Sequence, residues 1–213
     1  GLKNSEEKEG ELVALYCLNP KCYAQELERI AHFVGKHAFD IDGCGIKIVE
    51  QLLNEGLIQD AADLFTLKVG DLLPLERFAE KSAENLVSSI TAARSVSLAR
   101  FLVALSIPHV GEETAEDIAE HFGTLEKIKE ASIEQLYEVY GIGEKVAESV
   151  KSYFSDPAQQ KFIKKILQNG VEIKSEVRSP KSETLPLYGK TFVITGTLAS
   201  MSRDEAKEKI KAL

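Results

Sequence analysis

Apolar residues recur along this chain at matching distances from four turn-like tripeptides. The central residues of these tripeptides are 34, 32 and 32 residues apart. An apolar residue stands three places before each centre, and others stand five and eight places after it. A near-constant period with matching apolar positions predicts four copies of one structural unit. The centres are Cys44, Phe78, Val110 and Ile142; the matching residues are Ile41, Leu75, Ile107 and Val139 before them, Val49, Ala83, Ala115 and Ala147 five places after, and Leu52, Leu86, Ile118 and Val150 eight places after.

Each unit is predicted to be a tight turn that opens a helix, the helix-hairpin-helix pattern. Glycine permits positive φ and has no Cβ, so backbone N–H groups in a glycine turn can approach a ligand closely. Unpaired N–H groups and the helix dipole favour an anion at that point. Phosphate contacts of this kind predict nucleic-acid binding without sequence preference. The turns are Gly43-Cys44-Gly45 (copy 1), Arg77-Phe78-Ala79 (copy 2), His109-Val110-Gly111 (copy 3) and Gly141-Ile142-Gly143 (copy 4).

A short glycine motif can also be only a tight connection between two helices. Four copies in register favour DNA binding over that interpretation. The net charge of −8 favours the opposite interpretation, a protein-interaction scaffold in which the hairpins are helix connectors. DNA binding and the negative net charge can be reconciled if backbone amides and a few placed cations hold the phosphates.

The four copies differ in charge, which predicts a division of labour. Copies 1 and 4 have two turn glycines and a lysine three places after the centre, whereas copy 2 lacks glycine and should use side chains. Copy 3 is acidic, with no Lys or Arg from 101 to 126, so it should be mainly structural or contact DNA through its turn amides. The residues expected to contact DNA are Gly43, Gly45, Lys47, Arg77, Lys81, Ser82, Gly111, Thr114, Gly141, Gly143 and Lys145.

Two cysteines precede the repeat. Cys17 and Cys22 flank an Asn-Pro turn at a spacing that suits one half of a tetrahedral Zn²⁺ site. Cys44, the remaining cysteine, occupies a turn centre. Two thiolates fill only half of a zinc shell, so we expect zinc to be bound weakly or not at all, and two unpaired thiols are the alternative.

The remaining segments read as helices, followed by a change of composition. Amphipathic patterns predict helices over 24–36, 98–106, 125–130, 133–140 and from 157 to Asn169-Gly170, short helices within 57–73 with Leu73 in their core face, and a copy 2 helix that continues to about Arg94. Ser132 with Gln135 predicts a capping-box start, and Asp156-Pro157 opens the last helix. Lys161, Lys164 and Lys165 along that helix could form a backbone-contacting patch or a solvated face. Residues 174–187 are rich in Lys, Ser, Glu and Pro and are expected to be a linker. A strand at 189–198 and a helix from Ser202 then predict the start of an α/β domain, which the chain leaves partway through.

Bulk composition places the chain among soluble globular proteins. It has 213 residues, of which 44% are hydrophobic. It has no apolar run near the ~20 residues that span a bilayer and no export signal. We therefore expect no membrane partner and a cytoplasmic, nucleoid-associated location.

Together these features resemble the C-terminal half of bacterial NAD-dependent DNA ligases, over essentially the whole chain. Cys17-x4-Cys22 followed by Ala24-Gln25 looks like the second half of that family's four-cysteine zinc finger. Residues 38–155 look like its four helix-hairpin-helix motifs. Phe78-x-Glu80-Lys81-Ser82-Ala83 and Ile107-Pro108-His109-Val110-Gly111 look like signatures of copies 2 and 3. Residues 188–213 look like the opening of a BRCT domain, with its Thr195-Gly196 turn.

The resemblance implies a mainly α fold: a partial zinc-finger segment (1–23), a helix-hairpin-helix domain (24–173), a linker (174–187) and a truncated BRCT domain (188–213). It implies a parent enzyme that seals nicks in double-stranded DNA during replication and repair, using NAD and Mg²⁺, with other repair proteins reached through BRCT. The family's Lys-x-Asp-Gly nucleophile does not occur here, so no catalytic residue is expected and the fragment alone should not be adenylated. The hairpin module of another repair protein, of the excision-nuclease type, is the alternative.

Overall fold

The computed structural model describes residues 22–175, 192–193, 202, 205–206 and 209–210. The chain divides into two compact units, residues 1–176 and 177–213. Cys17 and most of the predicted BRCT segment lie outside the described residues.

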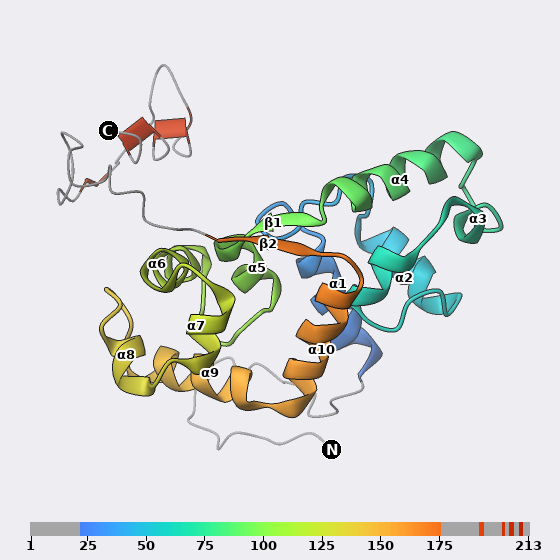
Figure 1. The fold of residues 1–213 in the computed structure, drawn as a ribbon. Helices are drawn as coiled ribbons and strands as arrows, with labels where there is room; N and C mark the ends of the chain where they lie inside the picture. The colour runs from blue at the N-terminus through green and yellow to red at the C-terminus, as the bar shows by residue number, and fades with distance from the viewer. Residues whose placement is uncertain (1–21, 176–191, 194–201, 203–204, 207–208, 211–213) are drawn as a thin grey trace, which may run out of the picture. The chain divides into compact units, whose positions relative to one another are not determined.

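The first unit is mainly helical (Figure 1). Within it, α2, α3 and α4 lie toward one side and α6 to α9 toward the other, and α5 packs against α1, α6 and the strand pair. Its elements are α1 (Tyr23–Phe33), α2 (Ile46–Asn54), the 3-10 helix η1 (Ala61–Thr66), α3 (Val69–Leu72), α4 (Glu80–Ala92), β1 (Ser95–Ser97), α5 (Leu98–Ala104), α6 (Glu112–Phe122), α7 (Leu125–Glu130), α8 (Ile133–Tyr137), α9 (Glu144–Ser155), α10 (Pro157–Gln168) and β2 (Glu172–Lys174).

The predicted repeat is the framework of the core. The residues three places before the four turn centres are 3–8% exposed, and those eight places after are 0–3% exposed. Five places after, Val49, Ala83, Ala115 and Ala147 are all 0% exposed. Small residues dominate this last position, which is consistent with close approach of neighbouring segments to the helix. The hydrophobic pattern therefore predicted the buried face of every copy.

Capping residues set the helix boundaries. Ser132 and Gln135 form the predicted capping box at the start of α8: the Gln135 N–H donates to Ser132 Oγ and the Ser132 N–H donates to Gln135 Oε1. Asp156 accepts from the Ala158 N–H and precedes Pro157 at the first position of α10. Three predicted helices are shorter than expected, because α1 ends at Phe33, α5 at Ala104 and α8 at Tyr137.

A pair of short parallel strands was not predicted. Val96 of β1 lies opposite Ile173 of β2, and Ser97 lies opposite Lys174. The helix expected to continue to about Arg94 ends at Ala92, and β2 includes Lys174, the first residue of the predicted linker. Three residues carry too little alternation to identify a strand, so pattern alone could not find this pair.

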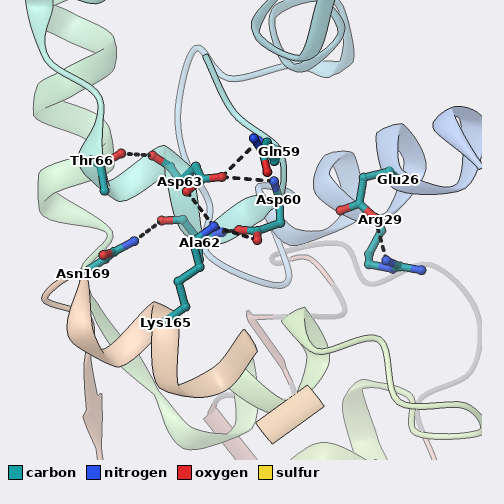
Figure 2. A network of polar contacts seen from close by, with 9 residues as sticks. All are labelled: Glu26, Arg29, Gln59, Asp60, Ala62, Asp63, Thr66, Lys165 and Asn169. Atoms are coloured by element: carbon teal, nitrogen blue, oxygen red, sulfur yellow. Dashed lines mark hydrogen bonds and ion pairs between the residues drawn. The ribbon is translucent and has the colours of Figure 1, made fainter. Parts of the chain in front are cut away.

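Partly buried polar contacts join α10 to η1 (Figure 2). Lys165 Nζ lies 2.8 Å from Asp60 Oδ2 and 2.7 Å from Asp63 Oδ1. Burial alone would lower the pKa of Lys165, but its contacts with the two carboxylates outweigh burial and raise that pKa. Asn169 Nδ2 donates to the Ala62 carbonyl at 2.7 Å. Lys165 therefore belongs to the fold, which removes it from the row of α10 lysines that could face a ligand.

Arg94 fastens the same region from the other side. Its guanidinium donates to the Asn169 and Phe65 carbonyls, each at 2.6 Å.

Leu73, expected in the core face of 57–73, is instead 47% exposed at the end of α3. The short helix ends at Leu72, so Leu73 no longer continues its buried face.

In the second unit the described residues begin a helix. Ser202 and Glu205 cap each other, since the Glu205 N–H donates to Ser202 Oγ and the Ser202 N–H donates to Glu205 Oε2. Residues 205–206 and 209–210 are helical, which confirms the start predicted from Ser202. Across the described part of the chain, helices lack the length and apolarity that crossing a membrane requires.

Candidate nucleic-acid interface

All four turns have one backbone conformation. The residue before each centre has positive φ: +77° at Gly43, +66° at Arg77, +66° at His109 and +75° at Gly141. The N–H of each centre donates to the carbonyl three residues earlier, over 3.1–3.3 Å. Copy 2 was expected to differ because it has no glycine, yet its turn has the same shape. The core positions therefore impose the conformation even where a side chain makes it costly.

The residue after each centre is the N-cap of the following helix. Gly45, Gly111 and Gly143 have φ of −70°, −90° and −94°, which any residue can adopt. A Cβ added at any of the three would meet no atom within 4 Å. Because the N-cap is glycine, it has no side chain to cap these helix starts, and the first residues of each helix are exposed. Within the described residues, neither backbone conformation nor packing therefore requires glycine at these positions.

In copy 2 the N–H of the N-cap residue itself is hydrogen-bonded within the protein. Its N-cap is Ala79, whose N–H donates to Ser82 Oγ at 2.8 Å. The Ser82 hydroxyl donates in turn to the Ala79 carbonyl at 2.8 Å. Ser82, predicted to contact DNA, thus has its proton engaged in capping α4. Ala79 and Ser82 do not match the usual capping-box pattern, so Ser82 was predicted only as a DNA contact.

The predicted lysines are exposed beside the turns of copies 1, 2 and 4. Lys47 and Lys145 stand at equivalent places on α2 and α9. Lys81 lies 4.0 Å from Glu84, with both side chains more than half exposed, so this ion pair contributes little. In copy 3 the equivalent residue is Glu113, and Thr114, which follows it, is half-buried on α6.

The charge of the first helical turn differs between copies. The first turn of α2 has no acidic residue, α4 and α9 have one each, and α6 has Glu112 and Glu113. His37, which precedes the turn of copy 1, lies 2.9 Å from Glu112 Oε2 through Nδ1. Because an acid near a bound phosphate is unfavourable, copy 1 presents the most favourable field and copy 3 the least.

Two grooves lie at equivalent places in the repeat. One, of about 450 Å³, lies between the turn of copy 1 and α4 of copy 2. The other, of about 490 Å³, lies between the turn of copy 3 and α9 of copy 4. Asp42 and Gly43 line the first from the turn, as Pro108 and His109 line the second. The helix residues that line them are Ser82, Asn85, Leu86 and Ser89 in the first and Lys145, Glu148, Ser149, Ser152 and Tyr153 in the second.

Of the predicted contacts, Gly43, Arg77 and Ser82 line the first groove and Lys145 lines the second, whereas the other seven line neither of these two grooves. His109 is not among the predicted contacts, although it lines a groove. In the aligned turns it occupies the place of Gly43, Arg77 and Gly141, but it is neither a glycine nor a lysine, the residue types on which the prediction mainly rested.

The predicted zinc half-site stays a prediction. Cys22 is the N-cap of α1, and its proposed partner Cys17 lies outside the described residues. Among the described residues there is no group of three or more His, Cys, Asp or Glu that could hold a metal ion. Cys44 is 2% exposed, and burial raises the pKa of its thiol to about 12, so it fills a turn and does not suit metal binding.

Comparison with known proteins agrees with this geometry. Residues 100–163, which contain copies 3 and 4, match the helix-hairpin-helix motif family. The chain is 44% identical over 202 residues to the DNA ligase of Anoxybacillus flavithermus, covering 94% of this chain and 30% of that protein. It is 44% identical over 209 residues to the DNA ligase of Lysinibacillus sphaericus (96% and 31%) and 44% identical over 198 residues to that of Desulfosudis oleivorans (92% and 29%).

The chain spans about 30% of the length of these curated relatives. Over almost all of its own length it is similar to them, and the hairpin motif lies where the repeat geometry places copies 3 and 4. In sequence and in motif content, the chain fits a C-terminal portion of a DNA ligase that carries helix-hairpin-helix motifs.

Proposed function

We propose that this chain is the DNA-binding portion of a DNA ligase and that it holds duplex DNA by its phosphate backbone, without sequence preference. The observation that carries the proposal is the glycine at the N-cap of copies 1, 3 and 4. Each has ordinary φ and open space where Cβ would be, and each stands beside the N–H groups of an exposed first helical turn. A phosphate that approaches the helix N-terminus would explain all three properties.

The division between copies follows from the same contacts. Copies 1 and 4 combine the open N-cap with Lys47 or Lys145, so they supply most of the affinity. Copy 3 has no lysine beside its turn, so its amides act against the field of Glu112 and Glu113. In copy 2 Ser82 occupies the N-cap amide, so Arg77 and Lys81 act through their side chains.

The activity of the whole protein is part of the proposal. Relatives named DNA ligase support a parent that seals nicked double-stranded DNA, and the resemblance to the NAD-dependent enzymes suggests NAD and Mg²⁺ as its cofactors. Lys-x-Asp-Gly does not occur in this chain, so adenylation and joining belong to the rest of the protein. Cys17 and Cys22 would supply two thiolates to a Zn²⁺ site, residues 188–213 would begin a BRCT domain that meets repair proteins, and the protein would act in the cytoplasm at the nucleoid.

The test is a substitution that stabilises the start of a hairpin helix and occupies the space proposed for the phosphate. In Gly143→Ser the new hydroxyl can cap the first turn of α9, which leaves stability unchanged or raises it by a few tenths of a kcal/mol. The same side chain fills the space that the phosphate needs. Losing one such contact should weaken duplex binding roughly fivefold, about 1 kcal/mol, equally on unrelated sequences.

Gly70→Ala, in α3, is the matched control. Its Cβ also meets nothing within 4 Å, but the site does not open a hairpin helix. This variant should bind DNA as the unmodified chain does. Equal affinity for Gly143→Ser and the unmodified chain, or a loss seen on one DNA sequence only, would contradict backbone binding.

A further inference from the structure

At one position of the repeat, two side chains hold a backbone conformation that favours glycine. At the position before the turn centre, copies 1 and 4 have glycine, whereas copies 2 and 3 have Arg77 and His109, both at φ +66°. A non-glycine residue in this region costs on the order of 1 kcal/mol, and the cost is greatest for bulky side chains. Copies 1 and 4 show that glycine suits this turn. The repeat therefore retains two strained residues where the unstrained one fits.

Nothing within the described residues accounts for that cost. Neither the Arg77 guanidinium nor the His109 imidazole has a hydrogen-bond or ion-pair partner among them, and both residues are exposed. Arg77 lines the groove of copies 1 and 2 from the turn of copy 2. His109 lines the groove of copies 3 and 4 from the turn of copy 3, at the place that Gly43 has in the first groove. Strained residues that persist without internal contacts are found where a ligand uses them.

We propose that Arg77 and His109 are equivalent DNA-contacting side chains, one for each groove, that hold a backbone phosphate where glycine turns use only amides. This rests on the proposed function and extends it to His109, which neither the hairpin pattern nor its glycines identify. Both side chains can donate hydrogen bonds to phosphate oxygens, and Arg77 always carries a positive charge. Copy 2, whose N-cap amide is engaged by Ser82, is the copy that most needs such a side chain.

Replacing each residue by glycine separates binding from folding. In Arg77→Gly and His109→Gly the strain is relieved, so the melting temperature should stay the same or rise by up to about 3 °C. DNA affinity should nevertheless fall roughly three- to tenfold, and for Arg77→Gly the salt slope should decrease by about one. If a residue had only a structural role, its substitution would change the melting temperature and leave the DNA affinity unchanged. Arg77→Lys should restore most of the salt slope.

Ser106→Gly is the control for strain alone. Ser106 also has positive φ, +51°, but its hydroxyl lies 3.1 Å from His32 Nδ1 and it does not line either groove. This variant should bind DNA normally. Loss of affinity equal to that of Arg77→Gly would show that backbone relaxation, and not the side chain, controls binding.

The outcomes distinguish the two proposals. If the unmodified chain does not bind duplex DNA, the proposed function fails. If it binds, and Gly143→Ser weakens it, but Arg77→Gly and His109→Gly bind as the unmodified chain does, only this inference fails.

Discussion

Copies 1 and 3 have the same turn backbone, but the first turns of their helices have opposite charge. Gly45 and Gly111 are both open N-caps, and the centre of each turn donates over 3.1 Å to the carbonyl three residues earlier. Yet the first turn of α2 carries Lys47 and no acid, whereas that of α6 carries Glu112 and Glu113. The shape of a hairpin therefore depends on its buried positions, while its electrostatic field is set by exposed residues that can vary independently.

The largest effect should come from the buried positions that the two copies share. Leu52→Ala in copy 1 and Ile118→Ala in copy 3 each remove a side chain that is 0% exposed. Each should lower the free energy of unfolding by about 2–5 kcal/mol, measured by urea denaturation. Leu73→Ala, at a residue 47% exposed, should change it by no more than about 0.5 kcal/mol. If truncation in one copy costs no more than this control, the two copies do not share a core role.

A smaller effect should follow from exchanging the charges that distinguish the copies. Lys47→Glu should weaken duplex binding roughly tenfold and reduce the salt slope by about one or more. Glu113→Lys should tighten binding, because it places a lysine where the other copies have one. Lys145→Ala should weaken binding and lower the slope, while Glu113→Ala should leave affinity unchanged or slightly higher. The DNA affinity of all four variants is measured by titrating unrelated duplexes across a salt series. An equal loss of affinity in all four would contradict the ordering of the copies by the charge of their first helical turns.

The smallest effect should come from exchanging the turn centres. Cys44 is buried and, with its pKa raised to about 12, stays a neutral thiol that packs like a small apolar group. Cys44→Val, and Val110→Cys in copy 3, should each change the free energy of unfolding by less than about 1.5 kcal/mol and leave DNA affinity unchanged. In the folded chain Cys44 should also resist alkylation, and labelling of this residue without unfolding would show that copy 1 opens.

The sequence predicted the helices and the core because both follow from periodicity. Matching apolar positions identified every turn centre, and capping residues such as Ser132 and Asp156 marked helix starts. Contacts between segments far apart in sequence could not be predicted in this way. The strands at 95–97 and 172–174 have no pattern of their own, and the partners of Lys165 lie more than 100 residues earlier.

The candidate site was predicted in type but not in detail. Glycines and lysines identified the turns, but the engagement of Ser82 by Ala79 depends on a local rotamer that composition does not reveal. The strain at His109 was hidden for a related reason. A histidine in a turn gives no sign of its φ until the four copies are compared in three dimensions.

The parallel pair of β1 and β2 has a mechanical consequence. β2 ends at Lys174, so the chain leaves the first unit directly from the strand that is bonded to Ser95–Ser97, at the midpoint of the repeat. Tension on the following chain would load β2 first and reach α10 only after the strands had separated. Arg94 and Lys165 bond the neighbouring segment to the core of the unit. A pulling force would therefore reach the four hairpins only after the two strands had separated.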